Sequence, residues 1–357
     1  MLEEMKVFLE NKNYSAIRVL LEDELVADIA EWMEELNKEQ RIVVFRLLPK
    51  NKAADVFSYL PLEIQQTLIL SLSETEMGAI IDDLYSDDAV ELIEEMPANV
   101  VKMILKNANS DTRATINQLL KYPEDSAGGH MSVDFVDLKP NMTVRDSIRR
   151  IRQIGIDKES INVCYVVDEK RHLLGIVSSR QLLLHPSDTI ISDIMTENVL
   201  SIHTLLDQEQ VAHEFSKYDY TIIPVVDNES RLVGIITIDD VVDIIEEEAT
   251  EDMEIMAAMA PSEKPYLKTP IFEIYKNRVP WLLILMISAT FTGRIIASFE
   301  ESLAACAVLT VYIPMLMNSG GNSGSQASVS VIRGLSLGEI ELKDILKIIW
   351  KESRLSM

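Results

Sequence analysis

INVCYVVDEKRHLLGIVSSR, residues 161–180, recurs in the same chain as YTIIPVVDNESRLVGIITID, residues 220–239. A Val-Val-Asp triplet stands at the same place in both stretches, and Gly175 returns 59 residues later as Gly234. Apolar β-branched runs broken by polar turns predict a strand, a turn, a second strand and then a helix in each copy.

The repeat extends upstream of both copies. HMSVDFVDLKPNMTV is echoed by DIMTENVLSIHTLLD, which aligns Met131 with Met195. A tandem repeat of this kind predicts two α/β units that pack against each other as a pseudo-symmetric pair. We assign this pair to residues 126–245.

The first 125 residues predict short helices. Turn signals recur about every 12 residues, at Leu48-Pro49, Leu60-Pro61, Leu72-Ser73, Tyr85-Ser86 and Met96-Pro97. The segments between them carry apolar residues at helical spacing, and proline cannot continue a helix. We therefore expect residues 1–125 to form an all-α helical-repeat domain, a small α-solenoid.

Residues 271–357 have the composition of a membrane domain. No charged residue occurs in 279–293 or in 302–332, and a bilayer core requires about 20 apolar residues per helix. These runs predict transmembrane helices at 279–299 and 303–333. Basic residues outside the pair and Glu300-Glu301 between its members place both outer flanks in the cytoplasm. The N-terminus lacks the pattern of a signal peptide, which agrees with cytoplasmic N-terminal domains.

The second predicted span is unusually polar. Asn318, Asn322 and Gln326 are spaced i, i+4, i+8 on one helical face, and glycines such as Gly321 lie beside them. Their carbonyl oxygens suit a hydrated hard cation, so we interpret Asn318, Gly321, Asn322 and Gln326 as the lining of a polar pathway. The alternative is a seam of small residues at which two helices pack.

Charge separates the chain into two parts. Residues 271–357 hold 8 Lys/Arg and 7 Asp/Glu, a net of +1, so residues 1–270, with 25 basic and 51 acidic residues, carry −26 of the chain's formal charge of −25. Such a chain would approach DNA or RNA against its own field, so no nucleic-acid partner is expected. The acidity peaks in an acidic connecting helix at 246–270.

Two acidic patterns indicate cation binding. Asp240, Asp243, Glu247, Glu251 and Glu254 form one stripe on a helix, and Asp87 and Glu91 share a face at i, i+4. Closely spaced carboxylates repel unless cations gather on them, and they are the ligands that Mg²⁺ or Ca²⁺ prefers. The alternative for both patterns is an ordinary solvated face.

The chain contains no motif of an enzyme. His203 and His213 are isolated, and neither a Ser/His/Asp nor an HExxH pattern occurs. The two cysteines, Cys164 and Cys306, have neither disulfide nor metal-ligand spacing. We expect no catalytic residue and no enzymatic activity.

The repeat resembles a CBS-domain pair, a sensor module. Many nucleotide sites of that family use a Gly, an apolar run, a Ser or Thr, and an Asp three residues later that holds the ribose. Gly234, Thr237 and Asp240 match this pattern in the second copy, whereas the first copy has Gln181 where the Asp would stand. The resemblance implies an adenine-nucleotide site at Thr237 and Asp240, whereas Gln181 in the first copy cannot offer a ribose the same bidentate acceptor.

The whole chain resembles the MgtE family of magnesium transporters and channels. The most specific motifs are YPEDSAGGHMS at 122–132, EEEATEDM at 246–253 and GGNSGSQAS at 320–328. The resemblance implies a multidomain homodimer in the bacterial inner membrane: an all-α domain, an α/β CBS pair, an acidic plug helix and α-helical transmembrane segments. Mg²⁺ would be both substrate and regulator, closing the pore when plentiful. Carried over by position, the implied metal ligands are Asp55, Asp87, Glu91, Asp219, Asp240, Asp243, Glu248, Glu251 and Asp252.

The family has five membrane helices with an Asp in the last, whereas this chain ends after two predicted spans, so we expect a fragment of a longer transporter. Two other functions remain open on the sequence. One is a membrane-anchored CBS nucleotide sensor without transport. The other is a transporter of another divalent cation, such as Co²⁺ or Mn²⁺, because oxygen-rich sites alone do not choose among such ions.

Overall fold

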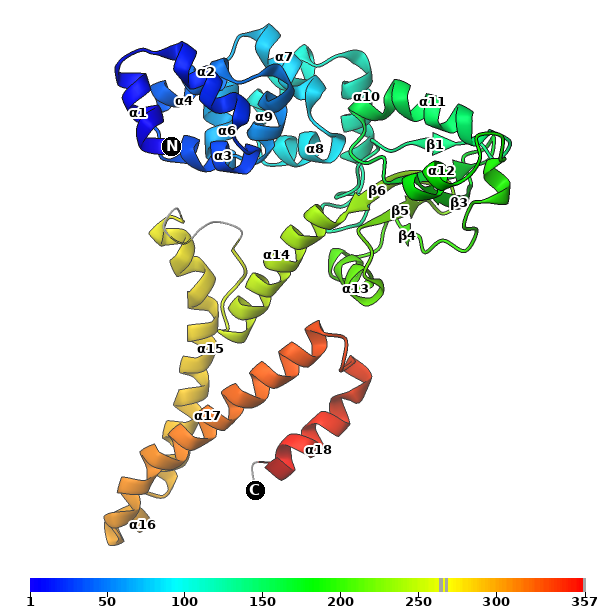
Figure 1. Ribbon diagram of the computed structural model, residues 1–357. Coiled ribbons are helices and arrows are strands. Elements are labelled where there is room, and N and C mark those ends of the chain that lie inside the picture. Colours follow the sequence, from blue (N-terminus) through cyan, green and yellow to red (C-terminus); the bar gives the residue numbers. More distant parts are fainter. Residues whose placement is uncertain (263–265, 267–268, 356–357) are drawn as a thin grey trace. The chain divides into compact units, whose positions relative to one another are not determined.

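The computed structural model describes residues 1–262, 266 and 269–355. The chain forms two compact units, residues 1–211 with 219–238 and residues 212–218 with 239–357. The first unit holds the N-terminal helices and two small sheets, and the second holds the acidic helix and the long apolar helices (Figure 1).

The N-terminal part is a stack of short helices, drawn in blue to cyan in Figure 1. From α2 onward the helices pack mainly on the next but one, as α3 does on α5, α5 on α7 and α7 on α9, which is the arrangement of an α-solenoid. The helices are α1 (Leu2–Glu10), α2 (Tyr14–Asp23), α3 (Val26–Glu34), α4 (Lys38–Leu47), α5 (Lys50–Ser58), α6 (Leu62–Ile69), α7 (Glu74–Asp83), α8 (Ser86–Glu94), α9 (Ala98–Asn107) and α10 (Ser110–Leu119).

The predicted turn signals are the starts of these helices. Pro49, Pro61 and Pro97 occupy the N-cap positions of α5, α6 and α9, with the extended backbone that a proline favours. Ser73 caps α7 through a capping box with Glu76, whose carboxylate accepts a hydrogen bond from the Ser73 N–H at 2.8 Å. The all-α prediction for this domain is confirmed.

The repeat forms two three-stranded sheets in the first unit. In each, a short strand pairs in parallel with the middle strand, which pairs antiparallel with the third. The strands are β1 (Asp137–Leu138), β2 (Val163–Val167), β3 (Leu173–Ser178), β4 (Ile202–His203), β5 (Ile222–Val226) and β6 (Leu232–Thr237). The accompanying helices are α11 (Val144–Ile154), α12 (Ser179–Leu184) and α13 (Gln208–Tyr218), with 3₁₀ turns η1 (Gly155–Asp157) and η2 (Ile191–Asp193).

The two sheets have the same register. Val166 pairs with Gly175 and Val225 with Gly234, and a register shift follows the valine in both sheets. Neighbouring turns also join the copies, because Leu232 N–H donates to the Arg171 carbonyl at 2.9 Å. The predicted strand–turn–strand–helix unit and its duplication are therefore confirmed.

Each copy completes the sheet of the other. Ser132, upstream of the first copy, exchanges two backbone hydrogen bonds of 2.8 Å with Ile235 of β6. Thr196, upstream of the second copy, does the same with Ile176 of β3 at 2.9 and 3.0 Å. We call residues 131–134 and 195–196 the crossing segments.

Both repeat glycines lie directly beneath a crossing segment. A Cβ on Gly175 would lie 2.7 Å from the Thr196 carbonyl oxygen, and a Cβ on Gly234 would lie 2.9 Å from that of Ser132. The aligned methionines complete these contacts, because Met195 covers Gly175 and Met131 covers Gly234. Glycine is required here by the close approach of backbone to backbone.

The acidic helix differs from the predicted connecting helix. We expected it at 246–270, but α14 runs from Ile238 to Met256 and follows β6 without a loop. Val241 and Ile244 in its first half are buried, so apolar packing extends the helix toward its N-terminus. It ends before Pro261, which cannot continue a helix.

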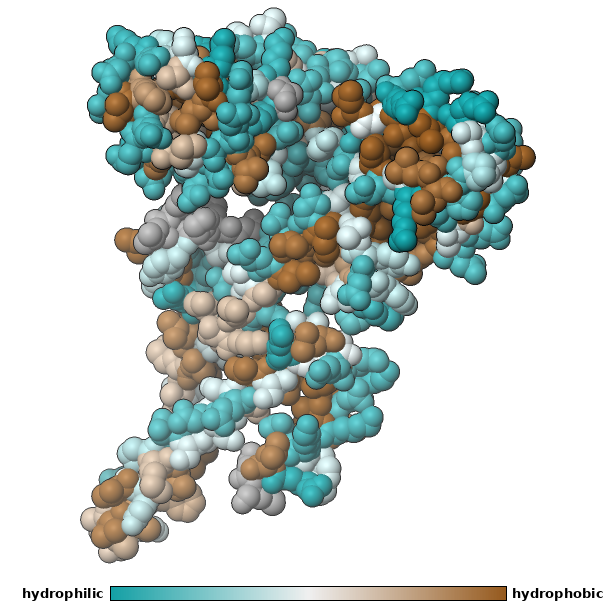
Figure 2. Space-filling view, in the orientation of Figure 1, coloured by the Kyte–Doolittle hydropathy of each residue, from teal (hydrophilic) through white to brown (hydrophobic). Residues whose placement is uncertain are grey.

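Long helices dominate the rest of the second unit. They are α15 (Ile271–Ser298), α16 (Glu300–Ala305), α17 (Val308–Ser336) and α18 (Ile345–Leu355), with the 3₁₀ turn η3 (Leu342–Asp344) before α18. α15 and α17 lie where the sequence predicted the transmembrane helices 279–299 and 303–333, with different bounds. Among the described residues, α15 alone is long and apolar enough to count as a candidate membrane span. Figure 2 shows apolar side chains exposed where α15, α16 and α17 meet.

Gly234→Ala should destabilise the first unit. The new methyl group would meet the Ser132 backbone, and overpacking of this kind costs roughly 1–3 kcal/mol. Thermal unfolding followed by circular dichroism measures the loss. The control is Gly293→Ala on α15, where nothing lies within 4 Å of the added Cβ; an equal unfolding temperature for Gly234→Ala and the parent would contradict the tight approach.

Candidate functional site

The N-terminus of α8 is anchored to a crossing segment. Ser86 N–H donates to Asp134 Oδ2 at 3.1 Å, and the Val133 N–H donates to Ser86 Oγ at 2.8 Å. The Ser86 and Ser132 hydroxyls are 3.3 Å apart, and both residues are buried. An acceptor at a helix N-terminus also stabilises the helix dipole, so Asp134 both caps and positions α8.

Asp134 also holds the loop before β2. Its Oδ1 accepts from Lys158 Nζ at 3.1 Å, and its backbone carbonyl accepts from the Glu159 N–H at 3.0 Å. One residue therefore ties together the start of α8 and the Lys158-Glu159 loop.

This arrangement brings two carboxylates together. An oxygen of Asp87, the second residue of α8, lies within 4.8 Å of an oxygen of Glu159, and both side chains are half-buried. We call Asp87, Asp134 and Glu159 with Lys158 the junction cluster. Two carboxylate oxygens within this distance can share one divalent cation, either directly at Ca²⁺-like bond lengths or through the waters that Mg²⁺ keeps.

The electrostatics of the junction cluster are those of crowded negative charge. The pKa of Tyr85 is raised, first by burial and then by the charges of Asp55, Glu159, Asp134 and Asp87. Asp55 stays exposed, yet loss of surrounding water raises the pKa of its carboxyl. Asp55 and Asp87, both predicted from the sequence, thus lie near the same tyrosine.

The other acids predicted in this unit lie apart from the pair. Glu91 is exposed on α8 one turn after Asp87. Asp219 is exposed at the C-cap of α13, with a left-handed φ of +53°. Among the described residues, no group of three His, Cys, Asp or Glu with ligand atoms within 4.8 Å includes Asp55, Glu91 or Asp219.

Of the acids predicted on α14, Asp240, Asp243 and Glu251 lie on one stripe of the helix, and Glu248 and Asp252 lie beside that stripe. Asp243 has the clearest perturbation: its pKa is raised first by loss of surrounding water, and then by the charges of Glu246 and Asp239. Among the acids predicted on α14, Asp240, Glu248 and Asp252 are half-buried, whereas Asp243 and Glu251 are exposed. Because α14 has many carboxylates and no basic residue, its carboxylates repel one another, and a bound cation would reduce that repulsion.

The structure gives Gln181 a local role. Its Oε1 accepts from the Ser178 N–H at 2.8 Å and from the Ser178 hydroxyl at 3.0 Å, which caps α12. Its Nε2 donates to the Ile194 carbonyl at 2.9 Å. The side chain that stands in place of the ribose-binding Asp is therefore committed to capping α12 and to a hydrogen bond with the segment upstream of the second copy. In the second copy Thr237 is buried at the end of β6, and Asp240 lies in the first turn of α14.

The proposed pathway face is continuous on α17. Asn318, Asn322 and Gln326 lie on one unbroken helix and are exposed, as is Gly321. A Cβ added to Gly320, Gly321 or Gly324 would meet nothing within 4 Å. Among the described residues, this face is available for another helix or for a hydrated ion.

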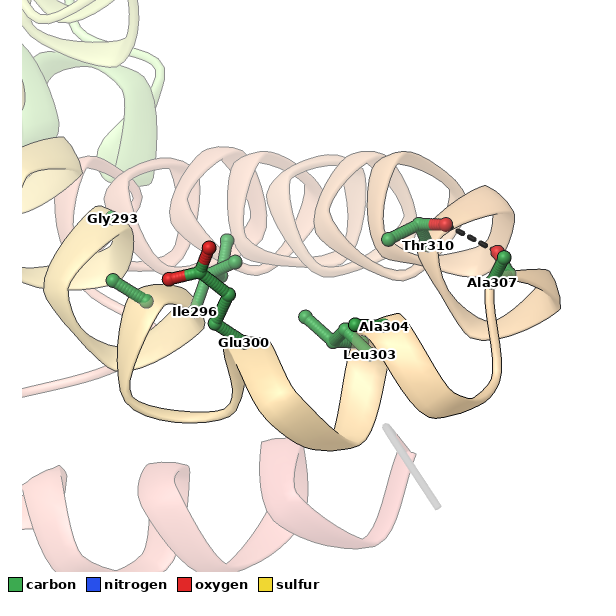
Figure 3. A pocket seen from close by; sticks show the side chains of 8 residues that line it. Gly293, Ile296, Glu300, Leu303, Ala304, Ala307 and Thr310 are labelled. Atoms are coloured by element: carbon green, nitrogen blue, oxygen red, sulfur yellow. Dashed lines mark hydrogen bonds between the residues drawn. The ribbon is translucent and has the colours of Figure 1, made fainter.

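A hollow lies where α15 turns into α17. It is lined by apolar side chains such as Ile296 and Leu303, with Glu300 at its edge (Figure 3). Thr310 beside it uses its hydroxyl to bond the Ala307 carbonyl. Since the lining offers few polar groups, this hollow suits lipid or another helix better than an ion.

Sequence reasoning missed three members of the junction cluster. Glu159 and Lys158 belong to a polar loop, and Asp134 belongs to a segment with no charge pattern. The one available signal was Met131, whose match to Met195 marks its segment as part of the repeat.

The donor set fits Mg²⁺. The pair of Asp87 and Glu159 supplies hard oxygens, and Lys158 of the same cluster pairs with Asp134 at 3.1 Å. Mg²⁺ is bound through one or two carboxylates while it keeps several waters, so two half-buried carboxylates satisfy its chemistry.

Titration of Asp243 and titration of Asp168 should change the stability of the folded chain in opposite directions. The raised pKa of Asp243 means that folded α14 binds this proton more readily than the unfolded chain, so folding is favoured as pH falls through that pKa toward 3.8. Asp243→Asn should therefore slow amide exchange in α14 at pH 7, and this difference from the parent should shrink on acidification.

The His172 hydrogen bond lowers the pKa of Asp168 to about 2. The stabilisation that the Asp168 carboxylate gives the folded chain is therefore present above pH 3.8 and lost as pH falls through about 2. Asp168→Asn should speed exchange in the β2–β3 turn at pH 7. If both substitutions slowed amide exchange, or if both speeded it, these pKa directions would be refuted.

Models of known protein families match the chain in order. The MgtE intracellular N domain matches residues 25–125, the CBS domain matches 127–188 and 191–247, and a divalent cation transporter domain matches 313–357.

Known proteins match over nearly the whole chain. The magnesium transporter MgtE of Thermus thermophilus is 37% identical over 349 residues, covering 96% of this chain and 77% of the relative. That of Bacillus subtilis is 31% identical over 353 residues, covering 96% and 78%. A crystal structure of the cytosolic domain of the Mg²⁺ channel MgtE in complex with ATP aligns with a TM-score of 0.65 at 37% identity, covering 68% of this chain and 100% of that one. By these matches, and by its helical domain, CBS pair and apolar helices, the chain belongs to the MgtE family of magnesium transporters.

Proposed function

We propose that the chain is a subunit of a homodimeric Mg²⁺ channel in the bacterial inner membrane, gated by Mg²⁺ on its cytoplasmic side. The observation that carries the gating proposal is the Asp87–Glu159 pair, whose oxygens lie within 4.8 Å although the residues are far apart in sequence. The transport proposal rests on the family membership and on the divalent cation transporter match.

The gate works by charge repulsion and its relief. Residues 1–270 hold 51 acidic and 25 basic residues, so the domains repel one another unless cations neutralise them. At high Mg²⁺, ions bound to the junction cluster and to the α14 stripe favour a compact closed state. At low Mg²⁺ the carboxylates repel one another, and the closed state is no longer favoured over the open state. Linkage requires that Mg²⁺ bind the closed state more tightly than the open one.

The path through the membrane uses α15 and α17 as a hairpin with Glu300 and Glu301 outside. Asn318, Asn322 and Gln326 line the path and contact the water shell of Mg²⁺ rather than replacing it, since Mg²⁺ dehydrates reluctantly. The open glycine face of α17 allows a helix of the partner subunit to approach closely. A multi-pass membrane protein with cytoplasmic N-terminal domains follows from this topology.

Adenine nucleotide is a second ligand of the CBS pair in this proposal. The related cytosolic domain was crystallised with ATP, and Thr237 and Asp240 of the second copy match the nucleotide pattern. Gln181 is occupied by its capping bonds, so one nucleotide per CBS pair is expected. A CBS sensor without transport is the less favoured function, because the transporter match extends over 313–357. Neither function requires an enzymatic step.

Asp87→Asn should raise the Mg²⁺ concentration that protects the chain from proteolysis. Loss of one charged ligand costs about 1.5–3 kcal/mol, so half-protection should need roughly 10–100-fold more Mg²⁺. Limited proteolysis of detergent-solubilised protein across a Mg²⁺ series measures this. Asp83→Asn, at the exposed end of α7, is the matched control and should behave as the parent. Cleavage of the parent that does not respond to Mg²⁺ would rule out the gate.

Asn322→Leu should abolish most Mg²⁺ uptake. The substitution replaces an amide that contacts the ion's water shell by an apolar side chain of similar size, while Ser330→Ala, whose hydroxyl bonds the Gln326 carbonyl, should leave uptake nearly intact. Uptake is measured with the coding sequence extended to the length of the relatives, in cells that lack other Mg²⁺ importers. Competition by Co²⁺ and Mn²⁺ in the same assay distinguishes a magnesium transporter from one for another divalent ion.

A further inference from the structure

The helix α18 is amphipathic and its apolar face is exposed. Leu346 is 78% exposed, Trp350 67% and Ile349 55%, far more than a soluble helix leaves to water in a packed domain. Lys347, Lys351 and Arg354 are spaced i, i+4, i+7 and therefore form a stripe on the opposite side of the helix. Glu352 falls within the apolar half.

The turn before α18 is tightly built. Gly338 adopts a left-handed φ of +65°, and the Ile340 N–H donates to the Gly334 carbonyl at 3.0 Å, so the chain reverses directly after α17. The Ile340 side chain packs over Gly334, where a Cβ would have no room. The turn follows Arg333, the first charge after the uncharged run of α17, which is where a membrane helix leaves the hydrocarbon.

The basic residues differ in their partners. Lys347 Nζ pairs with Asp344 at 2.6 Å, and Lys343 pairs with Glu341 at 2.6 Å. Within the part of the chain that the structure describes, Lys351 and Arg354 form no ion pair with a carboxylate. These two cations are therefore available to an external anion.

We propose that α18 lies in the plane of the cytoplasmic membrane surface, with its apolar face in the acyl–headgroup boundary and with Lys351 and Arg354 on anionic lipid headgroups. A helix with aromatic and aliphatic residues on one face and Lys or Arg on the other binds membranes in this way. Trp350 suits the boundary because its ring is apolar and its N–H is polar. This inference rests on the proposed membrane placement of α15 and α17.

The test uses the chain in lipid nanodiscs with single labels. Cys306→Ser removes the exposed thiol, while Cys164 can remain, since burial raises its pKa to about 12 and keeps it unreactive. An environment-sensitive fluorophore is attached at Ile349→Cys, at Lys347→Cys on the opposite face, or at Ile287→Cys in α15. Quenching is measured with aqueous iodide and with a nitroxide-bearing lipid.

The label at Ile349→Cys should be quenched by the lipid nitroxide and shielded from iodide, and the label at Lys347→Cys should show the reverse. Quenching of the Ile349→Cys label by iodide would overturn the proposal. Shielding from both quenchers would also overturn it, because a protein surface would then cover the face. The Ile287→Cys label reports insertion of α15 separately, so its quenching by iodide would count against the proposed membrane topology instead.

The lipid preference tests the charge contribution. In the Ile349→Cys background, docking should be stronger in phosphatidylcholine with phosphatidylglycerol than in phosphatidylcholine alone. Each basic residue at an anionic surface contributes about fivefold, or about 1 kcal/mol, so Lys351→Gln with Arg354→Gln should remove most of that preference. Glu352→Leu should strengthen docking in both lipids. Equal docking with and without phosphatidylglycerol in the parent would refute the headgroup contacts.

Discussion

The backbone pairing of Ser132 with Ile235 is the interaction on which the rest of the first unit depends. Ser132 completes the second sheet through two 2.8 Å hydrogen bonds, and its hydroxyl lies 3.3 Å from that of Ser86 on α8. Two residues later, Asp134 holds both α8 and the Lys158-Glu159 loop. A single extended segment therefore sets the distance between Asp87 and Glu159.

Placement of carboxylates matters more in this chain than their number. A surface with 51 acidic residues before residue 271 has no inherent preference for any cation. Where two carboxylates are brought together half-buried, as Asp87 and Glu159 are through the contacts of Asp134, water is scarcer and their mutual repulsion is less screened. Burial first, and then the negative charges of this region, raise the pKa of the neighbouring Tyr85. In the proposed gate, the general charge supplies the opening force and the few positioned carboxylates supply the affinity.

Local patterns predicted most of the fold. Each proline or serine signal between Pro49 and Pro97 marks a helix start because its effect on the backbone is confined to one or two residues. The repeat was visible because both copies bury apolar strands at equivalent positions. The spacing of Asp240 and Asp243 already placed them on the acidic helix, but the range assigned to the connecting helix, 246–270, left out the first half of α14, which runs from Ile238 to Met256.

The junction cluster could be predicted only in part. Asp87 stood out through its i, i+4 partner, yet the carboxylate that approaches it is Glu159, from a loop without periodicity. Contacts between segments so far apart depend on how Asp134 and Ser86 orient α8, and no local pattern encodes that. Gln181 shows the converse, because its departure from the Asp pattern was visible but its two capping bonds to Ser178 were not.

The exchange of crossing segments bears on how the chain is made. The segment with Ser132 leaves the ribosome well before its partner strand, β6, and must wait for nearly the whole repeat to be synthesised. The first sheet likewise stays without an edge partner until Thr196 emerges. Neither copy is a finished folding unit when its own residues are complete, so the nascent pair exposes open strand edges until both copies have been translated. Duplication has here produced one obligate cooperative unit from two similar halves.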